Sequence, residues 1–192
     1  MSANEKTFEE YRDLFKRGVS AYNKYDYKTS YACFSPIASR NSKFKYDAIF
    51  YLAKQYENGL GLSKNYSKAF YLYSEVSNNV SKFKYNAKIW LALHFENKNN
   101  YQKALEFYLD IYHNKPQKIN DIELLLADRL ERGIGDFKDD KKAFEFYSHL
   151  YTNIPKYKSF ARNSLIKCYK HGIGVGMDEE QAYKLENENF KI

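Results

Sequence analysis

The sequence predicts an all-α fold, a right-handed α-solenoid of five antiparallel helix-pair repeats. The first observation is an internal period, because one small residue recurs in similar surroundings at separations of 39, 35, 39 and 39 residues. A period of roughly 20–50 residues is typical of solenoids. The second is that aromatic residues recur at helical spacing, and the third is that no alternating run is bounded by hairpin turns. The recurring positions are Ser30, Ala69, Ala104, Ala143 and Ala182.

Three copies of the repeat share one frame, at residues 52–73, 126–147 and 165–185. In each of them, the first glycine of a Gly-x-Gly sequence comes ten residues before the recurring alanine. Two copies, at residues 18–34 and 91–108, lack the glycine pair and have a shorter loop. We therefore predict a single repeat domain over residues 1–192. Its repeats are expected at about 5–39, 44–78, 83–114, 119–153 and 158–192.

Each repeat is predicted to contain two antiparallel helices. In the second repeat, Leu52, Ala53 and Tyr56 form one apolar stripe on the first helix. Ala69 and Tyr73 do the same on the second helix. Alanine lets neighbouring helices approach closely, while tyrosine and phenylalanine fill the space beside it. The alanines expected at these contacts are residues 53, 69, 92, 104, 127, 143 and 182.

The segments between helices also have a consistent explanation. The glycine pair suits a left-handed cap at the end of the first helix, because glycine has no Cβ to clash there. Pro116 and Pro155 fall between repeats, where a helix should not continue. Residues 1–17 have apolar side chains at helical spacing and predict an opening helix, and residues 184–189 predict a short polar final helix.

The quoted pattern resembles the Sel-one-like (Sel1-like) repeat family, a branch of the tetratricopeptide-like α-solenoids. The copies at 52–73, 126–147 and 165–185 match the family's Gly-x-Gly loop and Lys-Ala-aromatic helix, except that Gln181 replaces the lysine in the last copy. The short-looped copies look more like ordinary tetratricopeptide units. The resemblance implies a protein-binding scaffold or adaptor without a cofactor. Short proteins of this type look like bacterial adaptors, including cytoplasmic immunity proteins that occlude a toxin.

Composition narrows the class of protein. No run approaches the roughly 18 apolar residues of a membrane helix. The first residues have no apolar segment and are followed by Glu9 and Glu10, unlike a secretory signal. Cys33 and Cys168 are isolated, whereas disulfide frameworks and zinc sites need clusters of cysteine. These observations predict a cytoplasmic protein.

Residue patterns typical of enzymes are weak. The glycine-rich loop Gly172–Gly176 follows a predicted helix, whereas a phosphate-binding loop follows a strand, so we interpret it as a turn of the repeat. Paired carboxylates at 139–140 and 179–180 open predicted helices, where they favour the positive end of the dipole. The sequence predicts no catalytic, cofactor-binding or metal-binding residues. The four histidines, which are scattered, are His94, His113, His149 and His171.

A nucleic-acid-binding protein is the alternative function. The formal net charge is +7, and Lys-Phe-Lys-Tyr segments at 43–46 and 82–85 interleave cations with aromatic rings, as does Lys156–Lys158. Lysines can neutralise phosphates while rings stack on bases. Each segment also enters a new repeat, where the rings would pack between helices and the lysines would be solvated. The packing explanation is favoured.

A concave groove is the predicted binding surface, because stacked helix pairs curve and their first helices line the inner side. Residues close to the leucine that anchors each first helix, as Leu52 does, are expected to face it. Trp90 is the only tryptophan and either a binding hot spot or a packing residue between repeats. A basic groove favours a partner with an acidic surface, such as a toxin or effector. The predicted partner-binding residues are Tyr51, Lys54, Gln55, Trp90, His94, Asp128, Arg129 and Lys167, with Cys168 beside them.

Overall fold

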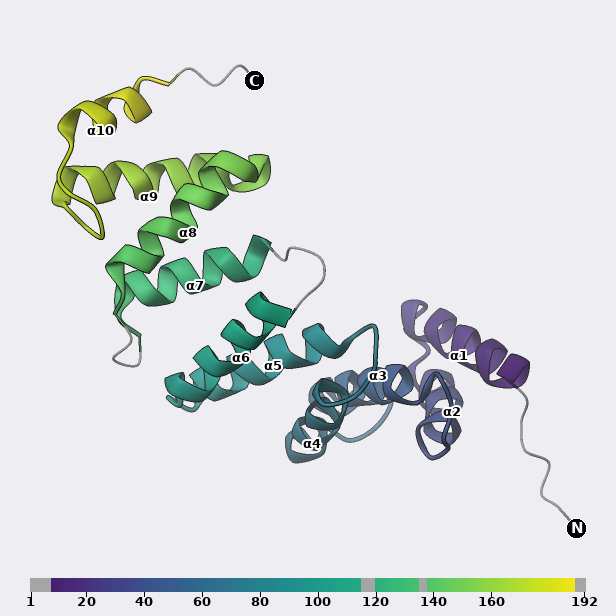
Figure 1. The fold of residues 1–192 in the computed structure, drawn as a ribbon. Helices are drawn as coiled ribbons and strands as arrows, with labels where there is room; N and C mark the ends of the chain where they lie inside the picture. Colours follow the sequence, from purple (N-terminus) through teal and green to yellow (C-terminus); the bar gives the residue numbers. More distant parts are fainter. Residues whose placement is uncertain (1–7, 115–119, 135–137, 189–192) are drawn as a thin grey trace, which may run out of the picture. The chain divides into compact units, whose positions relative to one another are not determined.

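The computed structural model describes residues 8–114, 120–134 and 138–188 (Figure 1). The chain divides into two compact units, unit 1 (residues 1–94) and unit 2 (residues 95–192). Unit 1 contains α1 (Phe8–Asn23), α2 (Tyr27–Ala38), α3 (Lys45–Asn58), α4 (Tyr66–Ser77) and most of α5 (Lys84–Asn97). Unit 2 contains the end of α5, α6 (Tyr101–Asn114), α7 (Asn120–Arg132), α8 (Asp140–Asn153), the 3-10 turn η1 (Pro155–Tyr157), α9 (Lys158–His171) and α10 (Glu179–Glu186).

These elements confirm the predicted all-α solenoid class with five helix pairs. No strand occurs among the described residues. In unit 1, α1 packs on α2 and α3 on α4, and α2 also contacts α3. In unit 2, α7 packs on α8 and α9 on α10, and α8 also contacts α9. The pairs α1–α2 and α3–α4 therefore pack on each other as well as internally, and so do the pairs α7–α8 and α9–α10.

The recurring small residues lie at the helix contacts. Ser30 and Ala69 are fully buried, and Ala104, Ala143 and Ala182 are each 1% exposed. The alanines of the first helices are buried in the same way, at positions 53, 92 and 127. Large aromatic side chains such as Tyr73 and Tyr147 fill the space beside them. The prediction that alanine permits close helix approach is confirmed at all seven positions.

The second helix of each pair begins with a side-chain cap. Asp26, Asn65, Asp139 and Asp178 each accept a hydrogen bond from the backbone N–H three residues later. Such a cap satisfies a backbone donor that has no partner within the helix. The acidic pairs at 139–140 and 179–180 therefore open α8 and α10, as predicted.

The Gly-x-Gly sequences form turns between the two helices of a pair. Gly59 and Gly172 end α3 and α9 in the left-handed region, with φ of 70° and 66°. Two residues further along each turn, Gly61 and Gly174 also have positive φ. Each of them faces the backbone at the start of the second helix of an adjacent pair. The interpretation of Gly172–Gly176 as a turn of the repeat is confirmed. Two prolines were predicted to lie between repeats. Pro155 lies in η1 between repeats, as predicted, and Pro116 lies outside the described residues.

Candidate protein-interaction site

A glutamate near the end of α3 connects three helices of unit 1. The Tyr73 hydroxyl on α4 donates to Glu57 Oε2 at 2.7 Å, and the Trp90 indole Nε1 on α5 donates to Glu57 Oε1 at 2.8 Å. Burial, and then the bond to the carboxylate, raises the pKa of Tyr73, so its hydroxyl remains a donor. Trp90 also stacks on Tyr73 with ring centres 4.2 Å apart. Trp90 therefore packs between repeats, one of the two roles its sequence position allowed.

Equivalent glutamates connect the helices of unit 2, but with cationic donors. Glu131 accepts from the Tyr147 hydroxyl at 2.8 Å and from Lys167 Nζ at 2.5 Å. Glu96 is held by two nitrogens of Arg129, at 2.8 and 3.1 Å. The hydrogen bond to Glu96 raises the pKa of Arg129 further, so the guanidinium stays charged. Two basic residues that the sequence predicted for the groove thus hold neighbouring helices together.

Other predicted groove residues have internal roles as well. Gln55 is fully buried, and its Nε2 donates to Tyr27 O at 2.7 Å and to Leu60 O at 3.2 Å. Asp128 pairs with Arg129 at 2.9 Å. Cys168 is buried, which raises the pKa of its thiol to about 11. We therefore leave Gln55 and Cys168 out of any proposed surface.

The sequence analysis did not single out Glu57, Glu96 or Glu131. A signal for them existed, because each follows the leucine anchor of its helix by five residues, as Glu57 follows Leu52. Five positions along a helix advance about 1.4 turns, so the glutamate lies on a different face from the leucine and about 7.5 Å nearer the helix end. The glutamate therefore meets the next pair where the helix ends.

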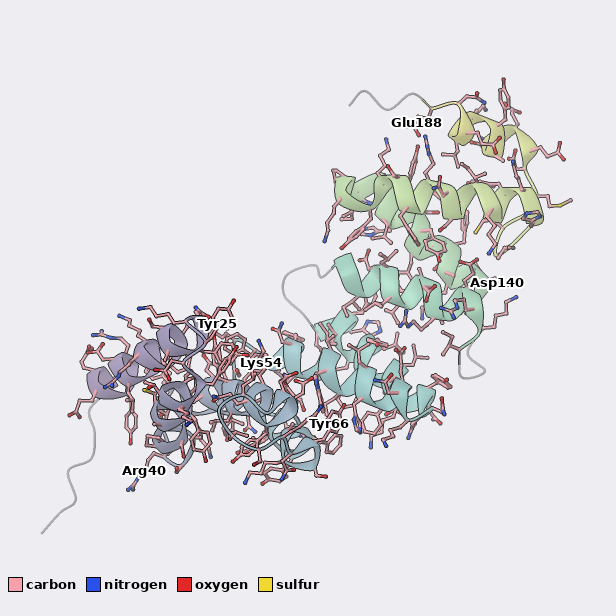
Figure 2. All side chains as sticks on the ribbon, turned by 180° about the vertical axis from the view of Figure 1, so that it is seen from behind. Tyr25, Arg40, Lys54, Tyr66, Asp140 and Glu188 are labelled. Carbon is pink, nitrogen blue, oxygen red and sulfur yellow. The ribbon has the colours of Figure 1, made fainter. Side chains whose placement is uncertain are left out.

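Two of the predicted groove residues, Tyr51 and Lys54, lie in an aromatic cluster of unit 1. The Tyr51 ring stacks on Phe34 at 4.7 Å and meets Tyr22 edge-on at 5.1 Å. The Lys54 ammonium lies 5.0 Å from the centre of the Tyr22 ring, a distance suited to a cation–π interaction. Tyr51 and Lys54 are partly exposed and lie on α3, where Figure 2 labels Lys54.

The last predicted groove residue, His94, belongs to a second cluster in unit 1. Its ring stacks on Trp90 and Tyr66, with centres 5.5 Å apart in both cases, and Phe70 lies 4.8 Å away. Tyr66 is 42% exposed, so this cluster reaches the surface of α4 (Figure 2). The structure therefore brings Trp90 and His94 together, and Tyr51 and Lys54 together.

An open cleft of about 500 Å³ lies along one face of α1 in unit 1. We call it the α1 cleft. Three lysines reach it, one from α1, one from the residue directly after α1 and one from the turn before α5, and no acidic residue lines it. Lys16 and Lys24 form no ion pair among the described residues, whereas Lys82 lies 3.7 Å from Asp47. The lining residues are Phe15, Lys16, Val19, Ser20, Asn23, Lys24 and Lys82.

A cleft of about 380 Å³ in unit 2, between α9 and α10, differs in charge. Its lining includes Lys170 and His171 but also Glu179 and Glu186. Lys170 and Glu186 form an ion pair at 2.5 Å across the two helices. The basic groups of this cleft are therefore largely balanced from within.

The whole net charge of the chain resides in unit 1. Residues 1–94 contain 15 of the 31 Lys and Arg residues and 8 of the 24 Asp and Glu residues, which gives +7, whereas residues 95–192 contain 16 of each. The lysine and arginine cations in the described ion pairs of unit 1 include Arg12, Lys45 and Lys82. In unit 2 they include Arg129, Arg132, Lys138, Lys158, Lys167, Lys170 and Lys184.

The described residues show neither a metal-binding cluster nor a membrane-spanning helix. They contain no group of three His, Cys, Asp or Glu side chains that could hold a metal ion. His149 Nδ1 lies 2.7 Å from Glu123 Oε2, a pair that joins α7 to α8. None of the described helices is long and apolar enough to cross a membrane.

The paired helices and their repeated contacts define an α-solenoid repeat protein. The Sel1 repeat family model matches residues 47–75, 123–148 and 167–185. The chain is therefore a Sel1-repeat protein, which confirms the resemblance seen in the sequence. Sel1 repeats generally mediate protein–protein interactions and are typically non-catalytic scaffolds. A comparison with curated proteins found no match.

Two solved structures are similar to this chain. A Sel1 repeat protein from Oxalobacter formigenes is 19% identical with a TM-score of 0.68, and the match covers 89% of this chain and 67% of that one. The protein c5321, a protective antigen present in uropathogenic Escherichia coli strains, is 19% identical with a TM-score of 0.64, over 93% of this chain and 38% of that one. The chain thus spans two thirds of the first protein and less than two fifths of the second. At this identity the likeness shows the fold.

Proposed function

We propose that this chain is a non-enzymatic protein-binding module whose unit 1 holds an acidic surface of a protein partner. The observation that carries the proposal is the placement of the entire +7 charge in unit 1, which also has a cleft lined by two lysines without an ion pair among the described residues. Charge complementarity speeds association and selects partners of opposite sign. The finer role is that of a bacterial cytoplasmic adaptor or of an immunity protein that occludes a toxin or effector.

The packing of the lysine-rich turns favours a protein partner over nucleic acid. The Phe83 ring stacks on Phe50 with centres 4.3 Å apart, and Lys82 lies 4.9 Å from its centre. Phe44 packs against Phe15 at 5.5 Å. Binding to single strands relies on rings with a face free for the bases. These two rings use their faces within unit 1 instead.

The test is affinity capture from a nuclease-treated lysate of the source organism at physiological salt. The bait is the wild-type chain or a variant with Lys16→Glu and Lys24→Glu. A matched control carries Lys98→Glu and Lys141→Glu, two exposed lysines of unit 2 without ion pairs among the described residues.

We expect the wild-type and control baits to retain the same protein and the unit 1 variant to lose at least tenfold in affinity for it. The reason is that the variant replaces attraction by repulsion only where the charge excess lies. Equal capture by all three baits would contradict the proposal. Recovery of nucleic acid alone from an untreated lysate would instead favour the nucleic-acid alternative.

A further inference from the structure

The loop between α1 and α2 places a tyrosine in a backbone conformation that suits it poorly. Tyr25 has φ of 64°, in the left-handed region, where a Cβ crowds the following carbonyl. Its side chain is 79% exposed, more than that of any other described aromatic residue. Backbone strain at an exposed residue indicates a role outside folding.

The other short-looped repeat shows what this turn requires. Between α5 and α6, Asn99 occupies the equivalent position with φ of 57°. The two turns match on both sides, because Lys24 and Lys98 precede these residues and a capping side chain follows, Asp26 in one and Asn100 in the other. Asparagine tolerates this conformation well, and tyrosine does not. The turn can therefore be made without a tyrosine.

Tyr25 is adjacent in the chain to a lining residue of the α1 cleft. It directly follows Lys24, which lines the cleft, and Figure 2 labels it where α1 ends. Its ring meets Tyr27 edge-on at 6.2 Å, and Tyr27 in turn meets Tyr22 at 5.3 Å. Since Lys54 lies over Tyr22, this row of rings connects Tyr25 to a residue that the sequence predicted for binding.

We propose that Tyr25 and the α1 cleft together dock an extended acidic segment of a protein partner, with Tyr25 as the main contact. This inference rests on the proposed function and names the part of the partner that is bound. Lys16 lies on α1 and Lys24 directly follows the last residue of α1, so eight residues at the helical rise separate them by about 12 Å along the axis. An extended peptide advances about 3.3 Å per residue, so carboxylates four residues apart would meet both lysines.

Tyr25 contributes contact area to binding, whereas Lys16 and Lys24 contribute charge. Exposed lysines contribute mainly to the rate of association and to selection by charge. A rigid aromatic side chain with a polar tip contributes contact area at a low cost in conformational entropy. An oligonucleotide is the less suitable occupant, because the site offers one exposed ring, that of Tyr25, and Phe15, which is only 6% exposed, along the cleft.

The probe is an array of 12-residue peptides built from Glu, Asp, Leu, Phe and Ser, followed by fluorescence polarisation of those that bind. A second array replaces the acidic residues by Lys and Arg, and labelled (dT)12 serves as the nucleic-acid probe. The protein variants are Tyr25→Asn, which installs the residue found in the equivalent turn, and Tyr71→Asn. Tyr71 is a matched control, because it is 65% exposed on α4 and does not line the cleft.

We expect acidic peptides to bind the wild-type chain and the Tyr71 variant, and Tyr25→Asn to weaken binding at least tenfold. The melting temperature of Tyr25→Asn should stay equal or rise by about 2 °C, because strain is removed. Loss of binding without loss of stability separates docking from a structural role. Equal binding by Tyr25→Asn, or (dT)12 as the only ligand, would overturn the docking site. If the partner captured from lysate is lost with the unit 1 lysines but not with Tyr25→Asn, the proposed function survives and this inference fails.

Discussion

In unit 1 the glutamate that connects the helices, Glu57, accepts its bond from the neutral indole of Trp90, whereas in unit 2 Glu96 and Glu131 accept theirs from Arg129 and Lys167. The position of the glutamate is the same in all three cases. The difference lies in the donor, and it decides where the basic residues of each unit point. Unit 2 uses Arg129 and Lys167 to connect its helices, whereas Lys16 and Lys24 of unit 1 form no ion pair among the described residues.

This difference shows that net charge alone is a poor guide to a binding surface in a repeat protein. Both units have nearly equal numbers of basic residues, 15 and 16. Only the contacts of those residues distinguish a cation that supports helix packing from one that a partner can reach. Three measurements test this difference between the units.

The largest effect is expected at a contact that both units share. A Cβ at Gly174 would lie 2.0 Å from the Asp140 carbonyl oxygen, and φ there is 71°. Gly174→Ala should therefore destabilise by roughly 3 kcal/mol or more, since backbone atoms must shift. Gly176 has no neighbour within 4 Å, so Gly176→Ala is the matched control. Urea denaturation followed by circular dichroism measures both, and equal stability of the two variants would contradict the proposed packing of this turn.

The second effect concerns the donors themselves. Arg129→Met leaves Glu96, whose side chain is 15% exposed, without its cation, and should cost about 2–3 kcal/mol. Trp90→Phe keeps a stacked ring and leaves Glu57 bound to Tyr73, so it should cost about 1 kcal/mol.

Thermal denaturation of the two variants measures this difference. Arg132→Met serves as control, because Arg132 is 64% exposed and pairs only at the surface, where pairs contribute about 0–1 kcal/mol. Equal losses of stability for Arg129→Met and Trp90→Phe would mean that the cationic donor of unit 2 and the neutral donor of unit 1 contribute equally.

The smallest effect is a pH dependence that originates in unit 2. Burial by itself raises the pKa of Glu131, but hydrogen bonds from Lys167 and Tyr147 outweigh burial and lower it below the ordinary value of 4.5. A carboxylate with a lowered pKa in the folded state stabilises the protein above pH 4.5, and this contribution is lost as the pH falls through the lowered value.

Melting temperatures between pH 6 and pH 3 test this dependence. Lys167→Met should lower the melting temperature at pH 6, and its difference from the wild-type chain should shrink toward pH 3. Lys142→Met replaces an exposed lysine with no ion pair among the described residues. It should leave the melting temperature unchanged at both pH 6 and pH 3. A difference for Lys167→Met that stays constant down to pH 3 would exclude Glu131 as its source.

The fold could be predicted from the sequence because its determinants are local and repeated. The alanine at each helix contact and the glycine at each turn are required by sterics, so Ala69 or Gly59 has the same meaning wherever its pattern recurs. The single-domain boundary over residues 1–192 stays a prediction.

The candidate site was harder to predict, for a physical reason. Spacing from a leucine anchor indicates the direction of a side chain but not its partner. Gln55 and Arg129 were expected to face a groove, yet each donates a hydrogen bond to an acceptor on another helix. Tyr25 was not singled out, because its significance depends on a backbone angle that no spacing reveals.

The turn glycines have a consequence for how this chain can change over generations. Gly61 approaches the backbone of Tyr27 and Lys28, and Gly174 approaches the backbone of Asp140 and Lys141. The partner in each joint is mainly main chain, so the side chains of the adjoining helix can be replaced without disturbing it. Repeats joined in this way can diverge in surface chemistry, one becoming basic and another neutral, while they still stack in the same manner.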